Sequence, residues 1–176
     1  MTNLLTGEYE AASVAARPAG DQLLSLAPAI RKVWMIKGAI AASVPTAGVL
    51  IYDVAGLIAG NRLPFGLLTL VVLVVSTALC TLIPRLRYRF WRYMLREQEL
   101  FLERGIFNRV RTVVPLRRIQ HLDVSQDLIE REFGLGKLIV HTAGSRSSDV
   151  VLPGLDIEDA NSLRDEVKNY ILEDAV

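Results

Sequence analysis

Sulfur and imidazole side chains are scarce in this 176-residue chain, which has one cysteine, Cys80, and two histidines. A single cysteine excludes an intrachain disulfide and gives no indication of an oxidising compartment. The histidines, His121 and His141, are too far apart to form a zinc-type ligand spacing, so we expect no metal and no cofactor. Both fall in predicted strands, where we expect core or interstrand histidines rather than ligands or catalytic bases.

The sequence also lacks the common catalytic patterns. It has no Gly-rich phosphate loop, Walker-type lysine, nucleophile elbow or paired-carboxylate signature. We therefore predict that the protein is not an enzyme and name no catalytic residue. A membrane-bound hydrolase would require His121 or His141 to be exposed beside Ser or Asp in a pocket.

Charge is missing from one long stretch. Residues 63–83, "LPFGLLTLVVLVVSTALCTLI", contain no charged side chain, and about 20 apolar residues cross a bilayer core. Residues 34–52, "WMIKGAIAASVPTAGVLIY", are similar in length, begin and end with interfacial aromatics, and include Lys37, which can extend towards the headgroups. We predict two transmembrane helices, about 34–52 and 63–83, joined by a short loop.

Positive charge gathers at the two outer ends of these spans. Arg31, Lys32 and Lys37 lie near the start of the first span, whereas the loop carries only Asp53 and Arg62, which cancel. The positive-inside rule therefore places both termini in the cytoplasm. The arginines that follow the second span are candidate contacts with an anionic membrane surface: Arg85, Arg87, Arg89 and Arg92. We expect no nucleic-acid partner.

Beyond Trp91 the pattern becomes that of a small α+β domain. Short runs rich in branched and aromatic residues predict antiparallel strands: "WRYML", "LFLERG", "VRTVVPL", "IQHLDVS", "KLIVHTA" and "DVVLPG". "DLIEREFG" predicts a short helix, and the residues after Asp156 predict an amphipathic C-terminal helix. We divide the chain into residues 1–32, a partly flexible N-terminal segment, residues 33–84, the membrane hairpin, and residues 85–176, the domain.

Three motifs in this domain, "VVPLRRIQHLDV", "FGLGKLIVHTAG" and "LPGL", resemble the bacterial pleckstrin-homology-type (PH) domain. With the hairpin before it, the chain is similar to the YdbS-like membrane proteins of that family. The resemblance covers about residues 85–174. It implies an α+β membrane protein, with a two-helix transmembrane hairpin followed by a PH-like antiparallel β-barrel or sandwich capped by a C-terminal α-helix. It also implies a bacterial cell membrane, and it implies no enzyme.

Charge within the domain gives the remaining functional indication. Residues 104–122 hold five arginines and no acid, and we name four of them as candidate headgroup or partner contacts: Arg109, Arg111, Arg117 and Arg118. Ordinary solvated charges, or partners for acids on neighbouring strands, are the favoured alternative for these arginines. We expect a non-enzymatic membrane-anchored adaptor or scaffold. Its expected partners are the anionic inner leaflet and either further copies of itself or a related PH-domain membrane protein. The alternative is an accessory subunit of a transporter or envelope-biosynthesis complex, in which the hairpin is the working part.

Overall fold

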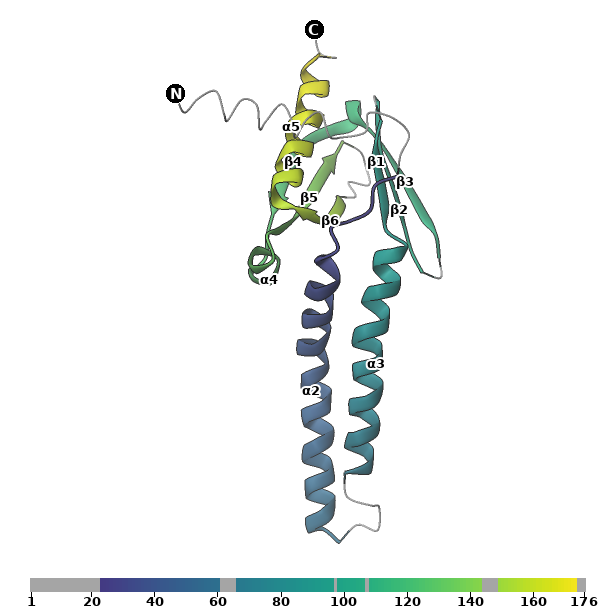
Figure 1. The fold of residues 1–176 in the computed structure, drawn as a ribbon, viewed down its shortest axis with the longest axis vertical. Helices are drawn as coiled ribbons and strands as arrows, with labels where there is room; N and C mark the ends of the chain where they lie inside the picture. The colour runs from purple at the N-terminus through teal and green to yellow at the C-terminus, as the bar shows by residue number, and fades with distance from the viewer. Residues whose placement is uncertain (1–22, 61–65, 97, 107, 144–148, 174–176) are drawn as a thin grey trace.

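A computed structural model describes residues 23–60, 66–96, 98–106, 108–143 and 149–173. Helices α2 (Ile30–Ile58) and α3 (Leu67–Arg89) pack side by side as a long stem, and a β-rich domain sits at one end of it (Figure 1). The predicted fold, a two-helix hairpin followed by an α+β domain, is confirmed. Most of the predicted flexible segment, residues 1–22, lies outside the described residues.

Both stem helices are long and apolar enough to cross a membrane, and most of their apolar side chains are exposed. Helix α2 is longer than the predicted span at both ends. In its first turn Ile30 and Val33 are buried in the domain, and its apolar sequence continues to Ile58. The 22 residues from Lys37 to Ile58 span about 33 Å, which matches a bilayer core. Helix α3 continues past Pro84 to Arg89, as the spacing of its arginines predicts.

Asp53 connects α2 to α3 at the end of the stem that is remote from the domain. The N-cap residue of α3 is Gly66, which has no side chain to accept a hydrogen bond from the helix. A carboxylate oxygen of Asp53 on α2 instead accepts from the backbone N–H of Thr69, at 3.0 Å, and from its hydroxyl, at 2.7 Å. Asp53 therefore takes the place of an N-cap for the neighbouring helix.

Two antiparallel sheets form the domain. The first has the order β1 (Arg92–Leu95), β2 (Glu99–Arg104), β3 (Val110–Pro115), and the second has the order β4 (Ile119–Ser125), β5 (Leu135–Thr142), β6 (Val150–Asp156). The 3-10 helix η1 (Leu116–Arg118) joins the sheets, α4 (Leu128–Glu132) lies between β4 and β5, and α5 (Ile157–Glu173) ends the described chain. Every predicted strand and both predicted helices are present.

The core lies between the sheets, α5 and the start of α2. Alternation along β2 buries Leu100 and Leu102, while Phe101 and Glu103 remain partly exposed. Helix α5 contributes its apolar face: Ala160, Leu163 and Val167. Because Ile30 and Val33 of α2 belong to the same cluster, the domain and the first membrane helix share one core.

The segment before α2 is also part of the domain. "GDQLLSLAPAIRKVW" is compatible with an interfacial helix as a sequence, yet residues 23–27 are not helical. Leu24 and Tyr93 exchange backbone hydrogen bonds at 2.8 and 3.0 Å, and the N–H of Ala27 donates to the carbonyl of Gly154 at 2.8 Å. With Leu26 buried beneath, the segment extends the first sheet instead of lying on the membrane.

Candidate membrane-facing basic site

A hollow of about 420 Å³ lies where α3 leaves the apolar stem and meets the β2–β3 turn. Helix α3 supplies Arg87, two residues before its end, and β2 supplies Arg104 at its last position. The other described residues that line it are Trp91, Gly105, Ile106, Asn108 and Val110. Two cationic side chains from segments 17 positions apart therefore face one hollow. We refer to it as the basic hollow.

Local backbone geometry fixes the turn that carries Arg104. Arg104 pairs with Val110 as the last pair of the β2–β3 ladder. Gly105 follows with φ +122°, and a Cβ atom there would lie 1.8 Å from the carbonyl oxygen of Asn108. Only glycine permits both this φ angle and this contact. The turn is therefore closed tightly beside the end of α3.

Aromatic rings position both guanidinium groups. Arg87 lies over the ring of Trp34, 4.4 Å from its centroid, and Arg104 lies 5.9 Å from the centroid of Trp91, which is buried. Such cation–π contacts stabilise a cation without neutralising it. Among the described residues, neither arginine forms an ion pair with a carboxylate. The basic hollow therefore holds two like charges that an anion would neutralise.

A second hollow, of about 410 Å³, lies between α2 and α3 within the stem. Its walls are mostly apolar: Trp34, Gly38, Leu79, Cys80, Ile83 and Pro84, with Lys37 and Arg87 as the charged members. Arg87 thus lines both hollows. The charged groups of the basic hollow and the apolar walls between the helices therefore meet at Arg87.

Lys37 links the stem to the domain rather than extending to the headgroups. Its ammonium group donates to the carboxylate of Asp127 and, at 3.1 Å, to Glu130. These two acids form the capping box of α4, in which Asp127 accepts from the backbone N–H groups of Ile129 and Glu130. Burial alone would raise the pKa of Asp127, but the hydrogen bonds from Lys37 and the α4 backbone hold that pKa below its usual value. These contacts of Lys37 with Asp127 and Glu130, which we call the Lys37 clamp, fix the domain against the stem.

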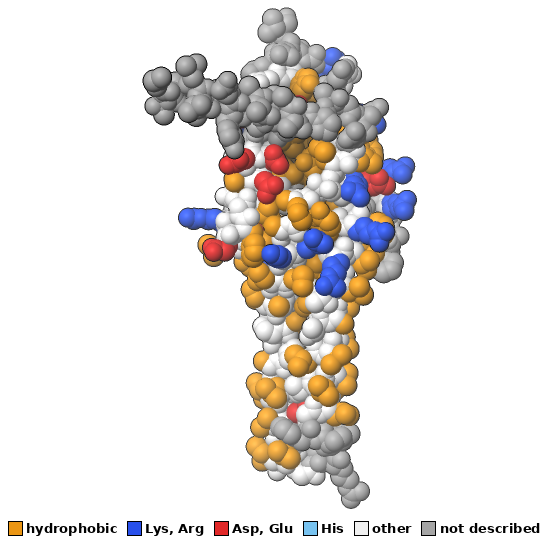
Figure 2. Space-filling model, viewed as in Figure 1, with side chains coloured by type: hydrophobic (Ala, Val, Ile, Leu, Met, Phe, Trp, Pro, Cys, Tyr) orange, Lys and Arg blue, Asp and Glu red, His pale blue; other side chains and the backbone are white. Residues whose placement is uncertain are grey.

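The predicted membrane-surface arginines lie at the end of α3 and the start of β1. Arg85, Arg87 and Arg89 are exposed on α3, and Arg92, which opens β1, is half-buried. Figure 2 shows Lys and Arg side chains gathered on the visible face where the apolar stem meets the domain. Of the four, Arg87 is the one that lines the basic hollow.

The other four predicted arginines do not form one cluster. Arg109 is exposed in the β2–β3 turn, and Arg111 forms an ion pair with Glu103 at 3.3 Å. Arg117 and Arg118 are exposed on η1, beyond the opposite end of β3. Six strand residues separate the two ends by about 20 Å. One site therefore cannot use all four side chains.

Arg104 is the member of the basic hollow that was not predicted as a contact. Its sequence signal was its position immediately before Gly105, because an Arg-Gly pair at the end of a strand places the arginine at a tight turn. What the sequence did not indicate is that this turn lies beside α3.

Comparison with known proteins extends the match beyond the domain. The family model of the bacterial PH domain matches residues 32–171, which include all of α3 and all but the first two residues of α2. The chain is 35% identical over 102 residues to UPF0699 transmembrane protein YdbS of Bacillus subtilis (strain 168), a match that covers 58% of this chain and 62% of that protein. It is 27% identical over 104 residues to UPF0699 transmembrane protein YdbT of the same organism, covering 58% of this chain and 20% of that protein. The chain thus spans less than two thirds of the length of either relative, and no solved structure matches it. It belongs to the bacterial PH domain family, as a YdbS-like membrane protein.

Proposed function

We propose that this chain is a non-enzymatic, membrane-anchored PH-domain adaptor that binds the headgroup of an anionic phospholipid in the basic hollow. The observation that carries the proposal is the pairing of Arg87 with Arg104 around one hollow, directly above an apolar stem. Neither side chain has a carboxylate partner among the residues described. A phosphate group supplies the missing negative charge.

The free energy that Arg87 and Arg104 can contribute is sufficient for binding a phospholipid headgroup. A basic side chain near an anionic leaflet gains about 1 kcal/mol from the surface potential. A direct hydrogen bond to a charged group adds about 1.5–3 kcal/mol, and guanidinium groups can bind phosphate in a bidentate manner. Phosphatidylcholine carries the same phosphate, so the selectivity comes from its quaternary ammonium group, which the two guanidinium groups repel and which phosphatidylglycerol lacks.

The distribution of charge supports a cytoplasmic domain in a bacterial cell membrane. Basic residues flank the stem where it meets the domain, whereas the middle of its two helices, residues 38–52 and 67–84, carries no charged side chain, and Asp53 lies five residues before the remote end of α2. The same observation disfavours the alternative of a transport path through the hairpin, because intramembrane charges usually mark such paths.

Strand β3 supports a second role for the adaptor, association with a partner protein. It is an edge strand of the first sheet, and Val110 and Val113 on it are 38% and 49% exposed. An exposed apolar edge can pair with a strand of another chain. A second copy or a related PH-domain membrane protein fits this edge, and attachment to the membrane raises the effective concentration of either to about the mM range.

Native mass spectrometry of the full-length protein in mild detergent tests the lipid proposal. The protein is incubated with phosphatidylglycerol or phosphatidylcholine, and the occupancy of the one-lipid state is measured for the wild type and for Arg87→Gln, Arg104→Gln and Arg118→Gln. Arg118 is the matched control because it is exposed on η1, away from the basic hollow.

We expect the wild-type protein to retain one phosphatidylglycerol in preference to phosphatidylcholine. Loss of one charge-assisted contact should lower that retention about tenfold in Arg87→Gln and Arg104→Gln and leave it unchanged in Arg118→Gln. Equal retention of the two lipids, or equal losses in all three variants, would overturn it.

A further inference from the structure

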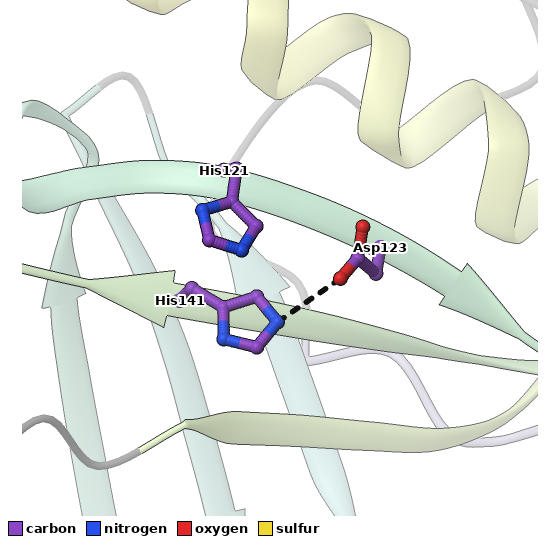
Figure 3. Close-up of side chains that lie close together, drawn as sticks. All are labelled: His121, Asp123 and His141. Carbon is purple, nitrogen blue, oxygen red and sulfur yellow. Dashed lines mark hydrogen bonds and ion pairs between the residues drawn. The ribbon is translucent and has the colours of Figure 1, made fainter.

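The outer face of the second sheet carries a cluster of imidazole and carboxylate groups (Figure 3). His121 on β4 lies opposite His141 on β5, and their rings stack with centroids 4.2 Å apart and an interplanar angle of 23°. Asp123 lies two residues further along β4, with a carboxylate oxygen 3.2 Å from Nε2 of His141. The intervening Leu122 packs against the core, so the three polar side chains share the opposite, outward face.

A fourth side chain extends this row across the sheet. Val140 pairs with Val150, which places Asp149, directly before β6, opposite His141. A carboxylate oxygen of Asp149 lies 2.7 Å from Nδ1 of His141. His141 therefore has a carboxylate at each ring nitrogen.

The geometry fits a metal centre after small rotations of the side chains. One ligand atom from each of His121, Asp123 and His141 lies within 4.8 Å of the others. Tetrahedral zinc with bonds of about 2.0–2.1 Å needs ligand atoms about 3.3 Å apart. His121 and Asp123 are exposed, so they can rotate without disturbing the core. A carboxylate on the second nitrogen of a ligating histidine, as Asp149 provides, fixes the tautomer and orients the ring.

We propose that His121, Asp123 and His141 bind one divalent transition metal ion of the zinc type, with Asp149 as the positioning residue. This differs from the expectation drawn from the sequence, in which both histidines are satisfied strand residues. The two histidines are 20 positions apart, so no short motif contains both, and it is the β4–β5 register that places their rings together. A bound ion would join β4 to β5 and leave a coordination position open to solvent.

Metal titration of the full-length protein in detergent tests this proposal. A tag-free protein carrying Cys80→Ser, which removes the chain's single cysteine, is titrated with Zn²⁺ by calorimetry and with Co²⁺ by absorption spectroscopy at neutral pH. His121→Gln, His141→Gln and Asp123→Asn each remove a ligand, and Asp149→Asn removes the positioning carboxylate. Glu132→Gln is the control, because Glu132 is an exposed acid on α4 outside the cluster.

One ion per chain should bind, with a Co²⁺ spectrum typical of nitrogen and oxygen ligands. Each ligand substitution should weaken Zn²⁺ binding more than tenfold, and Asp149→Asn about tenfold. The proposal is overturned if folded protein, verified by circular dichroism, binds neither ion, or if the His121→Gln/His141→Gln double variant binds Zn²⁺ as tightly as its parent.

Discussion

The ammonium group of Lys37 on α2 donates a hydrogen bond to the carboxylate of Glu130 on α4, at 3.1 Å and across 93 positions of sequence. The Glu130 side chain is only 5% exposed, so this contact is the most enclosed link between stem and domain among the described ion pairs. It explains how a PH-type domain can hold a fixed position above two helices. A site formed by residues from both parts, such as the basic hollow, requires that rigidity.

Lys37→Met should lower the free energy of unfolding by about 1–3 kcal/mol, because it leaves the buried Glu130 carboxylate without its cation. Thermal unfolding in detergent, followed by circular dichroism, measures the change. Lys32→Met is the control, since Lys32 is exposed on the same helix and has no ion-pair partner among the described residues. Similar unfolding of the two variants would argue against the clamp.

The pH dependence of stability should carry opposite contributions from Asp127 and Asp156. The pKa of Asp127 is held below its usual 3.8. Its ionised form therefore adds to the free energy of unfolding above pH 3.8, and this stabilising contribution is lost as the pH falls through the native pKa. Burial, followed by the nearby charges of Asp159 and Glu158, raises the pKa of Asp156. The ionised form of Asp156 therefore destabilises the native state at neutral pH.

Urea unfolding between acidic and neutral pH separates the two contributions. Asp127→Asn should be less stable than the wild type at neutral pH, and the difference should narrow in acid. Asp156→Asn should be at least as stable as the wild type at neutral pH, and its advantage should disappear below pH 3.8, where the carboxyl is protonated in both states. A loss of stability in Asp156→Asn at neutral pH would contradict this assignment of sign.

The strands, both helices of the domain and the hairpin could be predicted because each depends on a local pattern. Alternation along β2, the Asp127 cap of α4 and the charge-free stretch before α3's arginines are all readable within a few residues. The association of α2 with the domain was not predictable in this way. Ile30 and Val33 look like ordinary apolar residues before a membrane span, and only the fold places them in the core.

Gly154→Ala should disrupt this association. Gly154 has φ +67°, and an added Cβ would lie 2.6 Å from Cγ1 of Ile30. Overpacking of this kind costs about 1–3 kcal/mol, and the left-handed backbone adds to the cost. Thermal unfolding measures the loss. Gly48→Ala is the control, since it meets open space in the middle of α2 and should leave stability unchanged or slightly higher.

Asp53→Ala should fray the start of α3. It removes the acceptor for the N–H and hydroxyl of Thr69, and the loss of an N-cap costs about 0.5–2 kcal/mol. Asp53→Asn keeps an oxygen acceptor and should lose less. Hydrogen exchange at the first turn of α3 provides the local measurement, and exchange in Asp53→Ala that is no faster than in the wild type would show that the cap is dispensable.

The candidate sites were less predictable than the elements that carry them. Arg87 was identified from its position after a membrane span, but its pairing with Arg104 depends on where the β2–β3 turn lies. The His121–His141 contact depends on a strand register with a local irregularity between Ile119 and His121, which no short sequence window contains. Both sites arise from contacts between separate segments, and single-sequence patterns report mainly on contacts within one.

The most direct test of headgroup binding uses the chain's two tryptophans, Trp34 and Trp91, because each ring lies beneath one of the two arginines. Tryptophan emission of the full-length protein in detergent is followed during titration with short-chain phosphatidylglycerol or phosphatidylcholine, at low and high salt. We predict a saturable change with phosphatidylglycerol that weakens at high salt. Affinity should fall about tenfold in Arg87→Gln or Arg104→Gln, and by less than the product of the two losses in the double variant. An identical response to both lipids, or one unaltered in the double variant, would contradict headgroup binding between Arg87 and Arg104.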